Sequence, residues 1–246
     1  MPVQDWFATW FNSPYYHTLY KDRDLQEAEA FVDALVSHLA LPHGTRALDL
    51  ACGKGRHSLH LRQKGFDVIG LDLSGESIAE AKLYEQDGLE FFEHDMRSLY
   101  WHEYFDLVVN LFTSFGYFHN KKDDQQTISS VADALKPNGL FVLDFMNATK
   151  VKANLVTYEE KTIDNIRFEI TRAVETGVII KRIHVIDGEV ELDFEEQVDA
   201  LELSDFETYL TTAGLELVST FGNYNLESFN AESSDRLILV AKKHSR

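Results

Sequence analysis

The sequence predicts an α/β fold in which a mostly parallel sheet of seven strands carries helices on both faces. Up to residue 147, short apolar runs alternate with amphipathic stretches, which is typical of a parallel sheet covered by helices. Four β-rich runs with few helix signals then predict a small antiparallel insert after the fifth strand. A helix and two strands resume the main fold. We therefore expect a main domain at 1–148 and 203–246 and an insert at 149–202.

Local signals place the elements of the main domain. Apolar runs that indicate buried strands lie at 46–51, 66–73, 89–96, 104–112 and 140–147. Helical periodicity fills the intervals at 23–41, 56–65, 74–86 and 123–139. Pro42 ends the first helix, Gly65 has the C-cap position of the second, and Ser74 is the expected N-cap of the third. Pro137 and Gly139 are expected to end the fourth helix.

The insert and the end of the chain follow the same logic. The β-rich runs of the insert lie at 157–163, 166–174, 178–186 and 189–198. Asp187 and Gly188 form a strong hairpin turn between the last two. A helix at 203–214 follows, in which Ser204 and Glu207 have capping-box spacing and Gly214 has the C-cap position. Strands at 215–221 and 236–243 complete the sheet.

Composition narrows the classes of partner and site. Asp and Glu outnumber Lys and Arg by 41 to 23, and the net charge of −18 would repel nucleic acid. The single cysteine, Cys52, excludes an intramolecular disulfide and a Cys-rich zinc site, which fits a cytoplasmic protein. The histidines lack H-E-x-x-H spacing, so we expect no metal site. No window approaches the roughly 18 apolar residues of a membrane span, and we expect neither such a span nor a cleaved leader.

A glycine turn and two acidic residues mark the candidate binding site. In LDLACGKGRHS, residues 48–58, Gly53 and Gly55 let the backbone turn and let a ligand approach. Asp72 ends the second strand, where an acid accepts hydrogen bonds from both hydroxyls of a ribose. Asp95 follows the third strand and is placed to accept from an adenine amino group.

Asp49 distinguishes between two nucleotide-like ligands. An acid just before the turn repels a pyrophosphate but suits a ligand with a cationic amine and a sulfonium. The dinucleotide fingerprint also needs a third glycine where this chain has Ser58. The residues therefore favour S-adenosylmethionine. A nicotinamide-dependent oxidoreductase is one alternative, and a non-catalytic cofactor-binding module on the same fold is another.

These motifs resemble those of the class I S-adenosylmethionine-dependent methyltransferases. Further matching segments, in the family's order, are VIGLDLS, EHDM, FDLVVNLFTSFGYF and LKPNGLFVLDF. The resemblance implies a Rossmann-like sheet and methyl transfer to a small-molecule acceptor, an amine first and a hydroxyl next, with S-adenosylhomocysteine as product. The cofactor contacts that it implies are Asp49, Ala51, Gly53 and Gly55 for the methionine part, Asp72 and Leu73 for the ribose, Asp95 and Met96 for the adenine, and Asn110 and Leu111 for the amino group and sulfonium. Arg56 interrupts the family's longer glycine pattern.

A narrower resemblance involves the N-terminal segment and the insert. YYHTLYKDRDLQEAEAF, NLFTSFGYF and the position of the insert are similar to glycine N-methyltransferase and the amino-sugar N,N-dimethyltransferases. This resemblance implies that Tyr20 and Arg23 cover the cofactor, with the forked guanidinium of Arg23 on the methionine carboxylate. It also implies that the insert covers the substrate side. For the oligomeric state, a homodimer is the hypothesis.

Several residues keep both a functional and a packing interpretation. An aromatic stripe forms either a lid over the site or a packed face; its residues are Trp6, Phe7, Trp10 and Phe11. The candidates for a general base are Tyr117 and His119, followed by Tyr15, Tyr16 and His17. Methyl transfer from a sulfonium needs mainly alignment and exclusion of water, so no catalytic residue is assigned. Glu195 and Glu196 either face solvent or attract a cationic amine.

Overall fold

The computed structural model describes residues 6–21, 25–99 and 101–245, and it confirms the predicted α/β fold. Seven strands form sheet A in the order β10-β11-β5-β4-β1-β2-β3, and only β11 runs against the others. The strands of sheet A are β1 Arg46–Leu50, β2 Asp67–Asp72, β3 Leu89–Glu93, β4 Phe105–Asn110, β5 Leu135–Met146, β10 Leu215–Phe221 and β11 Arg236–Lys243. The strand order reverses between β1 and β4, which leaves a ligand crevice at the carboxyl ends of these strands.

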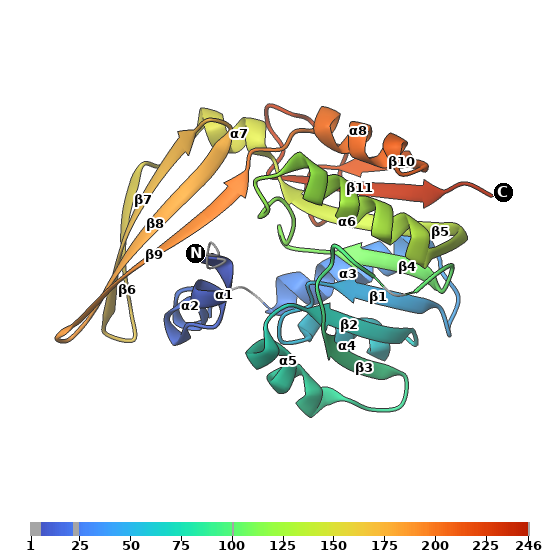
Figure 1. Ribbon diagram of the computed structural model, residues 1–246, viewed down its shortest axis with the longest axis horizontal. Coiled ribbons are helices and arrows are strands. Elements are labelled where there is room, and N and C mark those ends of the chain that lie inside the picture. The colour runs from blue at the N-terminus through green and yellow to red at the C-terminus, as the bar shows by residue number, and fades with distance from the viewer. Residues whose placement is uncertain (1–5, 22–24, 100, 246) are drawn as a thin grey trace.

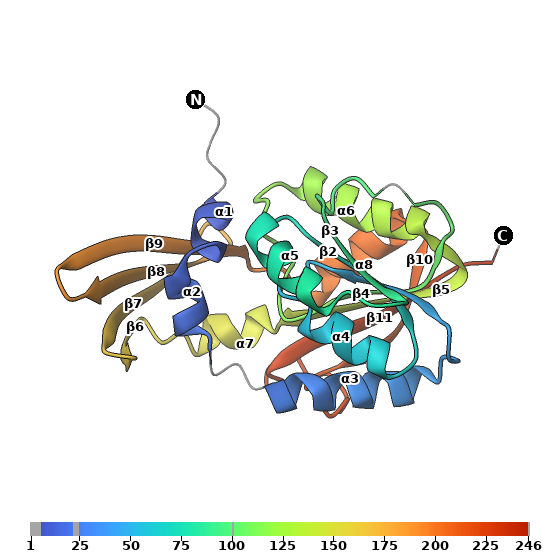
Figure 2. The same ribbon diagram turned by 90° about the horizontal axis from the view of Figure 1, so that it is seen from below.

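Helices cover both faces of sheet A (Figures 1 and 2). They are α3 Leu25–Leu39, α4 Arg56–Gln63, α5 Gly75–Ala81 with a 3₁₀ turn at Lys82–Tyr84, α6 Lys121–Ala134 and α8 Leu203–Thr212. Phe31, Leu61 and Ile78 bury α3, α4 and α5 in one apolar cluster. Val131 and Phe206 bury α6 and α8 in a second cluster against the opposite face. None of the described helices has the length and apolar character needed to cross a membrane.

A second, antiparallel sheet, called sheet B, projects from the side of sheet A where its parallel strands have their carboxyl ends (Figure 1). Sheet B has the order β6-β7-β8-β9, and α7, Ala148–Ala153, precedes it. Its strands are β6 Tyr158–Ile163, β7 Ile166–Glu175, β8 Val178–Asp187 and β9 Val190–Asp199. The hairpin predicted at Asp187 and Gly188 is confirmed. The domain limits at 149 and 202 remain a prediction, because the strands themselves span only 158–199.

Two short N-terminal helices pack against sheet B. They are α1, Trp6–Phe11, and α2, Pro14–Leu19. Trp10 and Leu19 share an apolar cluster with side chains of β7 and β8, among them Phe168 and Ile183. Figures 1 and 2 place α1 and α2 between sheet B and the end of sheet A that carries β2 and α5. The N-terminal segment therefore closes the space between the two sheets.

Several predicted helix ends are confirmed, but two differ. Ser74 caps α5 by accepting from the Ser77 amide at 3.1 Å. Helix α6 ends at Ala134, before Pro137, because Leu135 is already extended and joins β5.

The capping box predicted for α8 at Ser204 and Glu207 is wrong. It is made by Glu202 and Asp205, with the Glu202 amide donating to Asp205 Oδ2 at 3.0 Å. Leu201 and Phe206, buried in the same cluster on either side of this start, have the spacing of a hydrophobic staple. Burial of this pair explains why the N-cap, Glu202, lies two residues before the expected cap, Ser204.

Gly70 in β2 provides a test of the packing beneath the glycine turn. A Cβ at Gly70 would lie 2.5 Å from a ring carbon of Phe91 and 3.0 Å from the sulfur of Cys52. Because protein interiors are close-packed, we expect Gly70→Ala to lower the free energy of unfolding by about 1–3 kcal/mol in urea denaturation. Adding Phe91→Leu should recover part of this loss. Strictly additive losses in the double variant would contradict the assigned clash.

Candidate active site

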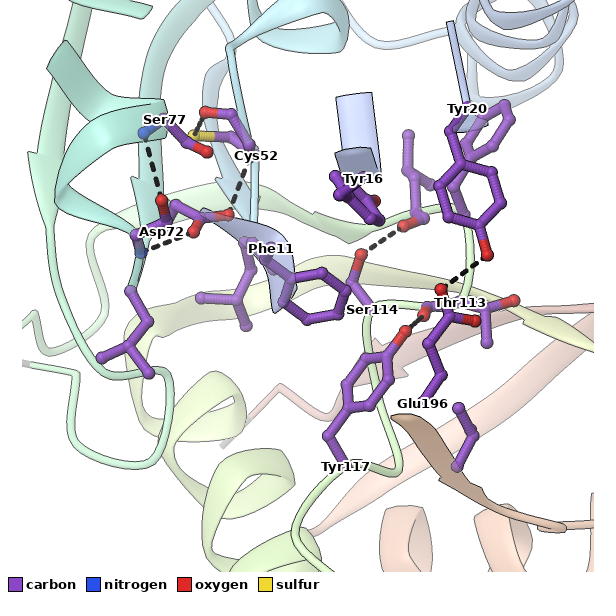
Figure 3. A pocket seen from close by; sticks show the side chains of 18 of the residues that line it. Phe11, Tyr16, Tyr20, Cys52, Asp72, Ser77, Thr113, Ser114, Tyr117 and Glu196 are labelled. Atoms are coloured by element: carbon purple, nitrogen blue, oxygen red, sulfur yellow. Dashed lines mark hydrogen bonds between the residues drawn. The ribbon is translucent and has the colours of Figure 1, made fainter. Parts of the chain in front are cut away.

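One cavity lies where the crevice of sheet A, sheet B and the N-terminal helices meet (Figure 3). Its volume is about 930 Å³. That is near the upper end of the roughly 300–1,000 Å³ of small-molecule sites. Nine of the predicted cofactor residues line it: Tyr20, Asp49, Ala51, Gly53, Asp72, Leu73, Asp95, Met96 and Leu111. Gly55 and Asn110 are not part of its wall, and Arg23 lies outside the described residues.

The glycine turn uses its two glycines for different purposes. Ala51, Gly53 and Gly55 all have left-handed backbone, with φ of 62°, 54° and 80°. A Cβ on Gly53 would meet no atom within 4 Å, so this residue faces open space in the cavity wall. A Cβ on Gly55 would lie 2.6 Å from the Phe91 ring. Gly55 therefore lets the turn pack on sheet A, while Gly53 leaves room on the cavity side.

The carboxylate of Asp72 joins the end of β2 to the turn. Oδ2 accepts from the Gly53 amide and Oδ1 from the Ser74 amide, both at 2.8 Å. Each carboxylate oxygen can accept more than one hydrogen bond, so both can still serve a ligand. Burial raises the pKa of Asp72. The acid is thus held in place before any ligand binds.

Asp49 is a buried acid in the wall of the same cavity. Its Oδ2 accepts a hydrogen bond of 2.6 Å from the hydroxyl of Ser58. Burial raises the pKa of Asp49 to about 6, although the Ser58 hydrogen bond and the charge of Arg56 oppose the rise. Ser58 stands where the dinucleotide fingerprint has a glycine, and its role here is to orient Asp49. The carboxylate is ionised at neutral pH at a cost in stability.

Asp95 is engaged by Arg97, a partner that the sequence analysis missed. Arg97 donates from Nη2 to Oδ2 at 2.6 Å and from Nε to both oxygens at 3.0 Å. Burial favours a higher pKa for Asp95, but the hydrogen bonds from Arg97 outweigh it and the pKa is lowered. Asp95 therefore stays charged beside Met96 in the cavity wall.

The loop after β4 is held in an unusual conformation. Phe112 and Thr113 have φ of 59° and 60°, a left-handed region that non-glycine residues rarely adopt. Asp144 of β5 fixes both residues, because its Oδ2 accepts from the Phe112 amide at 2.8 Å and its carbonyl from the Thr113 amide at 3.0 Å. Arg236 donates to Asp144 at 2.8 Å and to the Thr113 hydroxyl at 2.9 Å. Such strained residues gather at functional sites.

An aromatic and cationic wall adjoins this loop. The Arg56 guanidinium lies 4.6 Å from the centre of the Phe112 ring, and His57 stacks on the same ring at 4.8 Å. Burial lowers the pKa of His57 to about 3, so its imidazole is neutral. Its Nε2 is buried and has no hydrogen-bond partner within the described ranges. The neutral ring thus packs against the Phe112 side chain beneath the cavity wall.

The candidate bases named from the sequence occupy different places. The Tyr117 hydroxyl lines the cavity and donates to the Thr113 carbonyl at 2.6 Å. His119 is outside the wall and pairs with Asp199 at 3.0 Å. His17 is in the wall, and burial is the main cause that lowers its pKa. No catalytic residue is assigned from these positions.

Glu196 of β9 ties the N-terminal helices to sheet B. Its Oε1 accepts from Trp10 Nε1 at 2.7 Å. The same oxygen accepts from the Tyr20 hydroxyl at 2.6 Å (Figure 3). Lys181 of β8 lies 3.4 Å from the other carboxylate oxygen. Glu195, on the opposite face, pairs with Arg182 at 2.9 Å. Of the two glutamates, only Glu196 belongs to the cavity wall.

The aromatic stripe serves packing and the cavity together. Trp10 packs on Phe194 of β9 with ring centres 4.6 Å apart. Phe11 lines the cavity and meets Tyr117 edge-on, with ring centres 5.7 Å apart. The side chains of Trp6 and Phe7 lie outside the described part of the chain.

Comparisons with known proteins place the chain among methyltransferases. A family model described as a methyltransferase domain matches residues 47–139. The putative methyltransferase YqeM of Bacillus subtilis (strain 168) is 30% identical over 214 residues, which are 83% of this chain and 86% of that protein. The glycine/sarcosine N-methyltransferase of Aphanothece halophytica is 28% identical over 231 residues, 90% of this chain and 83% of that protein.

Two further matches complete the comparison. The dTDP-3-amino-3,4,6-trideoxy-alpha-D-glucopyranose N,N-dimethyltransferase of Streptomyces venezuelae is 31% identical over 103 residues, 42% of this chain and 43% of that protein. The solved structure of an S-adenosylmethionine-dependent methyltransferase from Clostridium acetobutylicum ATCC 824 has a TM-score of 0.78 at 22% identity, covering 94% of this chain and 96% of that one. The matches confirm the resemblance seen in the sequence, and the solved structure confirms the fold.

The buried acid Asp49 predicts a specific pH dependence of stability. Its pKa rises from 3.8 to about 6 on folding, because burial disfavours the charged carboxylate. The preference of the folded state for the neutral acid stabilises the protein fully below pH 3.8, and this contribution is lost as the pH rises through 6. We expect Asp49→Asn to increase the free energy of unfolding by about 3 kcal/mol at pH 8 and to change it little at pH 4. Urea denaturation across this range measures the difference. A gain that does not vary with pH would contradict the assignment.

Asp124→Asn is the matched control. Asp124, in α6, is also buried and has a pKa raised to about 7, mainly by burial, but it is not part of the cavity wall. The control variant should therefore show a similar pH-dependent gain in stability. Unlike Asp49→Asn, it should leave ligand binding in the cavity unchanged.

Proposed function

The chain belongs to the S-adenosylmethionine-dependent methyltransferases, and we propose that it transfers the methyl group to the nitrogen of a small amine, with a hydroxyl as the second choice. The observation that carries the proposal is the buried carboxylate of Asp49 in the cavity wall, beside the glycine turn. It suits a cationic donor and opposes a pyrophosphate. The relative that acts on glycine and sarcosine, which matches 90% of this chain, supports nitrogen as the acceptor atom.

The wall of the cavity fits the nucleoside part of S-adenosylmethionine. Asp72 has two oriented oxygens for the ribose hydroxyls, and Leu73 lies beside it. Asp95 and Met96 are assigned to the adenine. Gly53 leaves open space where the ligand would pass the turn.

The wall offers both a negative and a positive side chain to the methionine part of S-adenosylmethionine. Asp49 is assigned to the ammonium group, and Leu111 lies in the wall after β4. Arg56 is assigned to the carboxylate, the role that the sequence resemblance gives to Arg23. The ammonium and carboxylate groups of the cofactor are thus assigned to the negative charge of Asp49 and the positive charge of Arg56, which lie in the same cavity wall. Gly55 and Asn110 hold the turn in place from outside the cavity wall. Gly55 packs the turn on the Phe91 ring, and Asn110 Nδ2 donates to the Leu50 carbonyl at 2.9 Å.

The residues of the chain position the reactants and exclude water. When bound, S-adenosylmethionine would supply a methyl group on a sulfonium, so that the lone pair of a neutral amine bonds to the methyl carbon while the carbon–sulfur bond breaks and S-adenosylhomocysteine leaves. Phe11, Tyr16 and Tyr20 of the N-terminal segment cover the cavity, and Tyr117 borders it after β4 (Figure 3). Enclosure by these rings desolvates the amine and aligns it with the methyl group. Glu196 holds Tyr20 in this cover through the hydrogen bond from the Tyr20 hydroxyl, and Lys181 lies beside its other carboxylate oxygen.

Binding of S-adenosylhomocysteine tests the assignment of the ribose. We expect the wild type to bind it in isothermal titration calorimetry and Asp72→Asn to lose about 10- to 100-fold in affinity, because hydrogen bonds to a charged carboxylate are lost. Asp67→Asn, at the exposed start of the same strand, is the matched control and should bind normally. Equal affinities for Asp72→Asn and the wild type would refute the assignment.

A panel of paired acceptors tests the transfer to nitrogen. Each pair contains an amine and the hydroxyl compound of the same skeleton, and glycine, sarcosine and amino sugars supply the amines. We expect formation of S-adenosylhomocysteine, followed by mass spectrometry, with amines at a rate about tenfold or more above that of their hydroxyl partners. Preference for hydroxyls would overturn nitrogen as the acceptor. Cofactor binding without any turnover would favour the non-catalytic module.

A further inference from the structure

Two cations stand side by side on the face of sheet B that lines the cavity. Arg172 of β7 and Lys181 of β8 are directly opposite each other in the strand register, and both are in the cavity wall. Like charges directly opposite on a sheet destabilise the pairing. The cofactor assignments above do not use these two residues. Each cation has an acid beside it, with Glu159 2.6 Å from Arg172 and Glu196 3.4 Å from Lys181, and together the two cations still suit a ligand group that carries negative charge.

Both side chains are held in place by neighbours. Arg172 donates from Nη2 to Glu159 at 2.6 Å and from Nη1 to the Val156 carbonyl at 3.3 Å. Lys181 contacts Glu196 and lies 4.5 Å from the centre of the Tyr20 ring. The side chains are only 22% and 13% exposed. Since a guanidinium carries five N–H groups, the two contacts of Arg172 orient it and leave donors for an oxyanion.

Apolar residues separate these cations from the turn that holds the cofactor. The next row of sheet B toward sheet A contributes Ile179 and Val198, which are paired in register and line the cavity. Other apolar residues of the wall are Met146, Val151 and Leu155. The cavity wall thus combines the acids Asp49 and Asp72, a group of apolar side chains, and the cations of sheet B.

The opposite face of sheet B shows a different use of arginine. Arg167 of β7 pairs with Glu169 of the same strand, and Arg182 of β8 pairs with Glu195. These arginines are 47% and 51% exposed, so solvent screens them. Because the whole chain carries a charge of −18, an anion needs local cations to bind. Arg172 and Lys181 supply them inside the cavity.

We infer that the methyl acceptor carries an anionic group, a carboxylate or a phosphate, which binds Arg172 and Lys181 while its amine reaches the donor. This inference rests on the proposed function, since it names the substrate class of that same cavity. Ile179 and Val198, one row from Lys181 on sheet B, would contact the part of the acceptor that links the amine to the anion.

Anion binding to the protein loaded with S-adenosylhomocysteine tests the inference. Pyrophosphate and malonate are titrated separately at constant ionic strength by calorimetry, which distinguishes a phosphate from a carboxylate source. We expect at least one of them to bind the wild type and Arg172→Gln to weaken that binding about tenfold. Arg167→Gln, on the same strand but on the outer face, should bind as the wild type does.

Two further measurements keep the outcome unambiguous. The double variant Arg172→Gln/Glu159→Gln removes both charges of this ion pair and should show the same loss of anion binding. Affinity for S-adenosylhomocysteine should stay unchanged in all these variants. Absence of anion binding by loaded wild type, or equal losses in Arg172→Gln and Arg167→Gln, would overturn the inference alone. Failure of the wild type to bind S-adenosylhomocysteine would instead overturn the proposed function.

Discussion

The two hydrogen bonds from Gly53 and Ser74 to Asp72 are the constraint on which the site depends. They fix the glycine turn to the end of β2, and the position of this turn determines where α4 begins. The Ser58 hydroxyl then orients Asp49 from that helix. Both acids of the cofactor site are thus placed by local bonds within one β-α-β unit. A site built in this way needs little rearrangement on binding, which favours affinity.

The other side of the cavity depends on contacts between distant parts of the chain. Glu196 joins Trp10 and Tyr20, which lie at the opposite end of the sequence, and this arrangement brings the N-terminal helices over sheet B. The acceptor side is therefore formed by segments that carry no common local motif. In the proposed function, the β-α-β unit binds the methyl donor, and the N-terminal helices together with sheet B select the acceptor.

This division explains how much the sequence could predict. The strands, the turn and eight of the nine predicted cofactor residues in the cavity wall follow local patterns, whereas Tyr20 came from the resemblance of the N-terminal segment. A glycine that packs and a glycine that faces a ligand look alike in sequence, so Gly55 could not be told from Gly53. The Asp144–Arg236 pair joins neighbouring strands of sheet A. A lone acid in the apolar run 140–147 was the available signal, because a buried charge needs a partner.

The raised pKa of Asp49 has a consequence beyond catalysis. A carboxylate kept away from water without its cationic counterpart makes the empty protein easier to unfold than the occupied one. Proteases act on opened chains, so molecules without a donor would be degraded first. The supply of methyl donor would then influence how long molecules of this protein persist.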